Sequence, residues 1–195
     1  MNFYDNSRDF AEAFAEKSAR RHAAALNFFS TFIDNYPTKE TMKLLLDFRI
    51  QHKIEQSLCF SETKVRVAAL ELCSKILHIE DFDDEFFSGF LFHVFPFYLL
   101  SNKQPYEEKM LMICVVRDVF FSKSVPAIIS LLSSGILDAL IECSIPRADR
   151  TSDQVWGNET EFPISMASRD LLSELCDRGI TSVVNVIYSD DEMVT

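Results

Sequence analysis

The sequence predicts an all-α protein built as an α-solenoid of about four stacked helical units, and three observations carry this prediction. One apolar pattern recurs four times, and the first three copies start 44 and 43 residues apart. A period of roughly 40–47 residues is typical of helical solenoids. Glycine is scarce, and most of the 18 phenylalanines fall in helical patterns that indicate a buried core. The four copies are the segments 23–33, 67–77, 110–120 and 167–176.

The first third of the chain is expected to hold three helices, placed by their caps and apolar spacing. The first spans residues 7–35 and ends at an Asn-Tyr-Pro turn. Thr38 can cap the second helix, which is followed by a break near 49–52. Ser61 is the expected cap of the third helix, over 63–78.

The middle of the chain is expected to hold a helix that is apolar on nearly every side. Acidic residues at 81–85 begin it, which suits the positive end of a helix dipole. The apolar stretch 86–97 indicates burial between neighbouring elements, and Pro96 is expected to kink or end that helix. Pro105 is expected to begin the next helix, which continues to Phe121.

The last third is expected to hold three helices and an inserted loop. Ser124 can cap a helix that breaks at 133–135, and a further helix follows over 136–144. The polar segment 145–162 is predicted to be an inserted loop, which explains why the last copy of the repeat starts 57 residues after the third. A final helix is predicted over 164–177.

Composition sets the expected class of protein and its partners. Residues 1–188 are expected to form a single domain, with a short helix near 180–188 and an acidic, flexible tail at 189–195. The net charge of −11 disfavours nucleic acid and favours a basic peptide or protein as partner. No signal peptide or membrane-spanning stretch is visible, and five isolated cysteines suggest reduced thiols in the cytoplasm or nucleus.

Two segments carry a resemblance to a known family. Residues 124–137 look like the passage from the second to the third helix of an armadillo unit, and 68–73 resemble its long third helix. The chain thus resembles armadillo/HEAT-type helical repeat proteins over residues 20–180, which implies a binding scaffold without catalysis. Nuclear-import receptors of this type use a ladder of tryptophan and asparagine, which is absent here. Asn27 occupies the repeat position that elsewhere holds Glu71, Cys114 and Asp170.

Polar residues beside the apolar rows form the predicted partner-binding face. Leu26, Leu70 and Ile113 share one inward-facing repeat position, at which the last unit has Arg169, as suits a unit that meets water. One polar pair per unit lies off these rows and is expected to line the concave face of the stack, where it binds a protein or peptide. The alternative is an ordinary solvated face. The pairs are Asn27 and Thr31, Glu71 and Lys75, Arg117 and Asp118, and Asp170 and Glu174.

Other candidate sites are weaker. Trp156 in the inserted loop can either anchor a partner or fold back over the last helices, and Ser189 precedes an acidic run typical of acid-directed phosphorylation. A metal site is not expected, because no tight pair of ligands occurs among the four residues that superficially suggest one. These are His52, Cys59, Cys73 and His78.

The expected function is therefore a non-catalytic scaffold, adaptor or subunit of a larger complex that binds another protein. The chain contains no nucleophile, phosphate-loop or dinucleotide motif, so no cofactor and no enzymatic activity are expected. Two alternatives stay open. One is a regulatory module of an enzyme, such as a chaperone nucleotide-exchange factor or a phosphatase regulatory subunit, and the other is an all-α enzyme with a buried site.

Overall fold

The structure is a computed structural model, and it describes residues 3–79, 86, 90–122, 124–145 and 161–178. Every regular element in this part of the chain is helical, as predicted. The elements are α1 (Phe3–Asn35), α2 (Lys39–Asp47), α3 (Ile50–Leu58), α4 (Thr63–Leu77), the 3₁₀-helix η1 (Phe90–Val94), α5 (Phe95–Leu100), α6 (Tyr106–Phe121), α7 (Val125–Ser133), α8 (Ile136–Ser144) and α9 (Glu161–Asp177).

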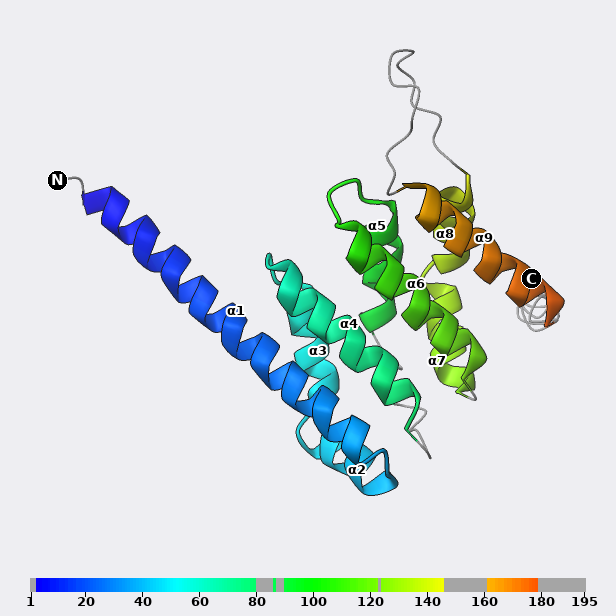
Figure 1. Ribbon diagram of the computed structural model, residues 1–195, viewed down its shortest axis with the longest axis horizontal. Coiled ribbons are helices and arrows are strands. Elements are labelled where there is room, and N and C mark those ends of the chain that lie inside the picture. The colour runs from blue at the N-terminus through cyan, green and yellow to red at the C-terminus, as the bar shows by residue number, and fades with distance from the viewer. Residues whose placement is uncertain (1–2, 80–85, 87–89, 123, 146–160, 179–195) are drawn as a thin grey trace, which may run out of the picture.

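The helices pack in two layers. Four long helices, α1, α4, α6 and α9, lie side by side in chain order and form what we call the front row (Figure 1). The shorter helices lie behind this row, where α3 packs against α4, and α8 packs against both α5 and α9. The N-terminal half of α1 extends beyond the rest of the row (Figure 1). Each long helix of the row contains one copy of the sequence repeat.

The core lies between the two layers and contains the predicted apolar rows. Leu26, Leu70 and Ile113 are at most 4 % exposed, so their shared repeat position faces inward as predicted. The described phenylalanines range from completely buried to exposed. Phe86, Phe92 and Phe95 are completely buried, whereas the predicted core role is wrong for others, which are more than half exposed. The exposed ones are Phe28, Phe48 and Phe97.

Two polar contacts between elements join residues that are 40 and 42 positions apart. The Arg66 guanidinium on α4 binds the Glu108 carboxylate on α6, 42 residues later, through Nε–Oε2 and Nη2–Oε1 distances of 2.9 and 2.6 Å. The Tyr98 hydroxyl donates to the Leu58 carbonyl, 40 residues earlier, at 2.8 Å. In these two cases, residues 40 and 42 positions apart therefore lie on elements that contact each other.

Three helix boundaries follow the predicted capping chemistry. The Thr38 hydroxyl accepts a hydrogen bond from the Thr41 amide at the start of α2, and the Ser124 hydroxyl accepts one from the Ala127 amide at the start of α7. Gly135 separates α7 from α8 with a φ of 82°, a left-handed conformation in which glycine carries no Cβ penalty.

Other boundary predictions are wrong. The N-cap of α4 is Glu62, whose side chain makes no cap hydrogen bond, and not Ser61. The Ser61 carbonyl instead accepts a hydrogen bond from Arg66 Nη1, so an arginine inside α4 holds this junction. Pro96 lies in the first turn of α5 and thus begins a helix, because the missing N–H of proline leaves no intrahelical bond unmade there.

Several predictions fall on residues that the structure does not describe. These are the acidic helix start at 81–85, most of the loop 145–162, the short helix at 180–188 and the tail 189–195. The final helix begins at Glu161, three residues before the predicted start at 164.

Candidate functional site

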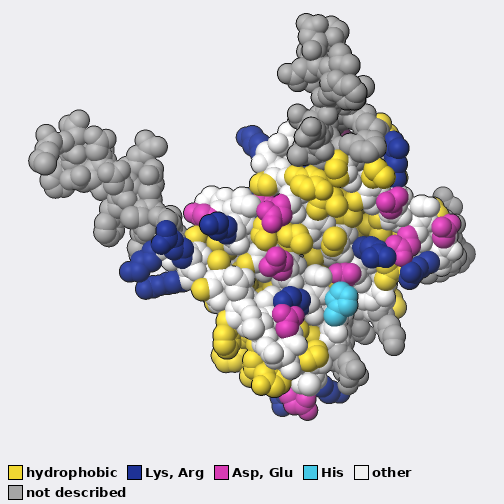
Figure 2. Space-filling model, viewed as in Figure 1, with side chains coloured by type: hydrophobic (Ala, Val, Ile, Leu, Met, Phe, Trp, Pro, Cys, Tyr) yellow, Lys and Arg dark blue, Asp and Glu magenta, His cyan; other side chains and the backbone are white. Residues whose placement is uncertain are grey.

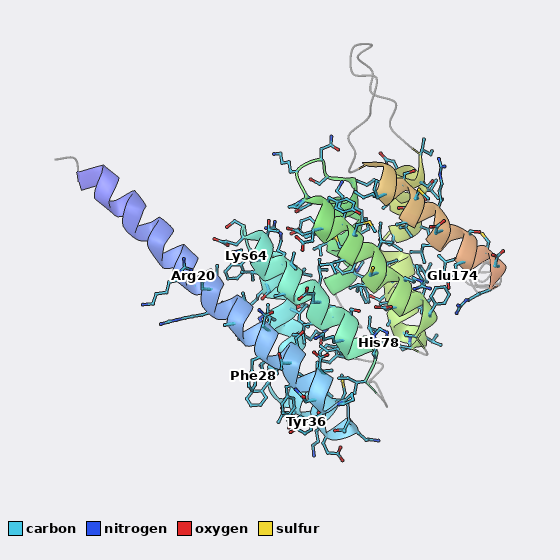
Figure 3. All side chains as sticks on the ribbon, in the orientation of Figure 1. Arg20, Phe28, Tyr36, Lys64, His78 and Glu174 are labelled. Atoms are coloured by element: carbon cyan, nitrogen blue, oxygen red, sulfur yellow. The ribbon has the colours of Figure 1, made fainter. Side chains whose placement is uncertain are left out.

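The eight predicted binding residues all lie on the front row, one pair on each of its four helices. Lys75, Asp118 and Glu174 are half-buried, and the other five are exposed. Figure 3 labels Glu174 and His78, whose side chains lie at the α6–α9 and α4–α6 junctions of this row. These residues thus lie along one row, although Asn27 and Glu174, 147 positions apart in the sequence, are on the helices at its two ends.

At the α1–α4 junction, one of the predicted residues, Lys75, contacts the neighbouring helix. The Lys75 ammonium forms an ion pair with the Asp34 carboxylate on α1, and both side chains are partly exposed. The Thr31 hydroxyl donates to the Asn27 carbonyl within α1 at 2.9 Å. Lys75 and Thr31 therefore already have partners within the protein.

The α4–α6 junction contains a serine, an aspartate and a histidine, the three residue types of a hydrolase catalytic triad. The Ser74 hydroxyl donates to Asp118 Oδ2 at 2.7 Å, and His78 Nδ1 lies 2.7 Å from the Ser74 backbone carbonyl. His78 Nε2 lies 4.0 Å from Asp118 Oδ1. Because the serine proton points to the carboxylate and not to the imidazole, this arrangement lacks the nucleophile–base pair of a hydrolase.

The α6–α9 junction contains a paired arginine and glutamate. Arg117 donates from Nε and Nη2 to the two carboxylate oxygens of Glu174, at 2.8 and 3.2 Å. These hydrogen bonds hold the pKa of the Glu174 carboxyl below its ordinary value and raise the pKa of Arg117. Arg178 also binds Glu174, at 2.9 Å, and its guanidinium lies 4.2 Å from the centre of the Phe121 ring.

Three of the predicted residues keep side chains that can serve a partner. Asn27, Glu71 and Asp170 are exposed, and their side chains make no hydrogen bond or ion pair with any residue that the structure describes. The other five link helices to each other or bond within a helix. The repeat spacing did not separate residues that hold the row together from residues left open to solvent.

A groove that the sequence prediction missed lies between α1 on one side and α3 and the α2–α3 link at Phe48 on the other. It measures about 350 Å³, and apolar side chains make up most of its lining. Its charged lining residues are Arg21 and Lys53, with no carboxylate. The signal for it was the four-residue spacing of Phe28, Phe32 and Tyr36, of which the first two lie on α1 and the third directly follows it, so that neighbouring rings contact each other. The lining residues are Arg21, His22, Ala25, Leu26, Phe29, Phe48, Ile50, Lys53 and Ser57.

The remaining candidates are not assembled into a site by the structure. Within the described residues, no group of three or more histidine, cysteine or acidic side chains could hold a metal ion. Cys73 from the four-residue metal pattern is completely buried, and this burial raises the pKa of its thiol. Trp156 and Ser189 lie outside the described residues.

Comparisons with known proteins add no family to these observations: no family model, curated protein or solved structure matches the chain. No single helix in the described segments is long and apolar enough to cross a membrane. Helices α7 and α8 would pass that test only as a pair, and they are bent by 64° relative to each other.

Proposed function

We propose that this protein is a non-catalytic interaction scaffold, built as an armadillo/HEAT-like solenoid of about four units, that binds a partner protein through the exposed face of the front row. The observation that carries the proposal is the convergence of the repeat's polar positions on one row of four helices. In this reading each long helix is the last helix of one unit. The shorter helices before α4, α6 and α9 complete the second, third and fourth units.

The chemistry of the open positions supports a basic partner. Glu71 and Asp170 are exposed carboxylates on the two helices that flank α6, and neither is paired with a described residue. The chain as a whole has a net charge of −11. A protein or peptide with lysine and arginine side chains would gain from both the local and the overall field, whereas nucleic acid would be repelled.

A cytoplasmic or nuclear location is part of the proposal. All five cysteines are free thiols, and three of them, Cys59, Cys114 and Cys176, are exposed. Free and exposed thiols suit a reducing compartment, where disulfides are rare.

The experiment is affinity purification of the tagged full chain from its own cells, followed by mass spectrometry. The test variant combines Glu71→Lys with Asp170→Lys, and the control is Asp138→Lys, which reverses an exposed carboxylate on α8 in the other layer. We expect the test variant to lose its specific partners at least tenfold, while the control keeps them and circular dichroism shows both folded. Equal recovery with both variants would refute binding at the front row.

A further inference from the structure

We propose a second binding surface, distinct from the front-row face, in which the groove between α1 and α2–α3 takes an acidic amphipathic helix of a partner protein. This inference goes beyond the function proposed above. Three features carry it: the shape of the groove, an aromatic stripe that continues the groove along α1, and the positive charge at one end of both.

The groove has an apolar floor and one unsatisfied polar group. Leu26 and Ile50 are buried at its base, and Phe48 forms a wall with 58 % of its surface exposed. Ser57 also contributes to the lining, and its buried hydroxyl has no hydrogen-bond partner in the described structure. Buried hydroxyls are usually satisfied. Because the Ser57 side chain is completely buried below the surface, what the floor presents to a ligand is an apolar pocket for a large side chain.

An exposed aromatic stripe extends the groove along α1. Phe28 and Tyr36 are 64 % and 58 % exposed, and Phe32 lies between them. The centroid of the Phe32 ring is 6.4 Å from that of Phe28 and 5.3 Å from that of Tyr36. Phe28 also contacts Phe29 in the groove, at a centroid distance of 5.6 Å. Figure 3 shows the labelled Phe28 and Tyr36 side chains projecting from the edge of α1 that faces away from α4. Monomeric proteins seldom leave such a contiguous apolar surface uncovered.

The length of this surface identifies the kind of occupant. Arg21 and Phe32 share one stripe of α1, and Tyr36 follows directly after its last residue, Asn35; at about 1.5 Å of rise per residue the surface from Arg21 to the end of α1 is about 21 Å long. That length matches four turns of a partner helix and exceeds the span of a small ligand. A helix laid in such a groove presents apolar anchors at positions i, i+4, i+7 and i+11. The central aromatic pocket is where its main anchor would sit.

The charge of the surface identifies the partner's polar side chains. Arg21 and Lys53 line the groove, and Lys17 lies one turn before Arg21 on the same stripe. All three are exposed, and none of them forms an ion pair with a described residue. Figure 2 shows lysine and arginine side chains (dark blue) gathered where α1 leaves the body of the molecule. In a chain with 30 acidic and 19 basic residues this cluster is an exception, so acidic residues on the partner complement it.

A second copy of this chain is a less suitable occupant. None of the residues that line the groove is acidic, so another copy of it would leave the cations of both molecules unpaired. A dimer through this surface is therefore an outcome that would overturn the proposal. Size-exclusion chromatography with light scattering detects such a dimer when the full chain is compared with a Phe28→Ser variant. If the full chain is a dimer and the variant is a monomer, the aromatic stripe serves self-association.

The probes for the test are two displayed libraries of 16-residue helices with leucine or phenylalanine at positions i, i+4, i+7 and i+11. One library has glutamate on the flanking positions, and the other has lysine. We expect the full chain to enrich members of the glutamate library only. The affinity of an enriched peptide is then measured by fluorescence anisotropy. The double variant Arg21→Glu, Lys53→Glu should reduce this affinity at least tenfold. The control variant Lys43→Glu, at an exposed position on α2 outside the groove, should change it little.

The outcomes separate this inference from the proposed function. Enrichment from the lysine library alone, or from neither library, would overturn the acidic-helix proposal. So would an enriched peptide whose affinity is the same for the groove variant and for Lys43→Glu. The front-row variant with Glu71→Lys and Asp170→Lys should bind the peptide as the unmodified chain does. Either surface can thus fail while the other is retained.

Discussion

The ion pair between Arg66 and Glu108 makes the most specific prediction about how the helices hold together. The Glu108 side chain is completely buried and that of Arg66 is 9 % exposed. Besides its two bonds to Glu108, the guanidinium donates to the Ser61 carbonyl at 2.6 Å and to the Thr63 hydroxyl at 3.2 Å. One side chain thus joins α4 to α6 and also fixes the α3–α4 junction.

The perturbation is Glu108→Gln, which keeps the shape of the side chain and removes its charge. Removing one partner of a buried ion pair costs about 3–5 kcal/mol, because the other charge stays in a medium of low polarity. Arg66 retains its hydrogen bonds to the α3–α4 junction, so we expect the lower end, about 3 kcal/mol. That corresponds to a reduction of roughly 100-fold in the equilibrium constant for folding.

The assay is urea unfolding followed by circular dichroism. With a slope of roughly 2–3 kcal/mol per molar urea, the midpoint should fall by about 1–1.5 M at an unchanged slope. Glu71→Gln, which neutralises an exposed carboxylate on α4, is the matched control and should shift the midpoint little. A double variant with Arg66→Met should lose less stability than the sum of the two single changes. A shift no larger than that of the control would refute the reasoning.

Three further predictions concern single groups. Arg117 lowers the pKa of the Glu174 carboxyl, so the stability that this pair contributes is present above the unfolded-state pKa and is lost as the pH falls through the folded-state pKa. Arg117→Gln should raise the pKa of Glu174 in an NMR titration. An unchanged pKa would contradict the pairing. Cys73, whose thiol pKa burial raises, should resist iodoacetamide while exposed Cys59 reacts, as peptide mass spectrometry would report. Gly135→Ala should lower the free energy of unfolding by about 1–2 kcal/mol, because a φ of 82° is strained for alanine. Steric clash adds nothing to this cost, since no atom lies within 4 Å of the added Cβ. If thermal unfolding shows no change, the left-handed conformation of residue 135 is contradicted.

Much of the fold could be predicted because its determinants are local or periodic. Leu26, Leu70 and Ile113 recur at the spacing that puts one face of each long helix into the core, and all three are buried. Thr38 and Ser124 cap helices through bonds to amides three residues away, which the local sequence is sufficient to specify.

The parts that could not be predicted depend on contacts between distant elements. An exposed phenylalanine such as Phe28 has the same local pattern as a buried one, and only the position of α1 at the end of the row leaves that side uncovered. The groove was missed for this reason. In the same way, nothing near Lys75 in the sequence indicates that Asp34, 41 residues earlier, neutralises it.

The central claim is that the front row binds a partner protein, and site-specific photo-crosslinking tests it most directly. A photoreactive amino acid in place of Glu71 on α4 is compared with the same amino acid in place of Asp138 on α8, in cells that produce the full chain. We predict covalent adducts with a defined set of basic proteins from position 71 and none of these from position 138. The absence of adducts at position 71, or the same adducts from both positions, would contradict the account.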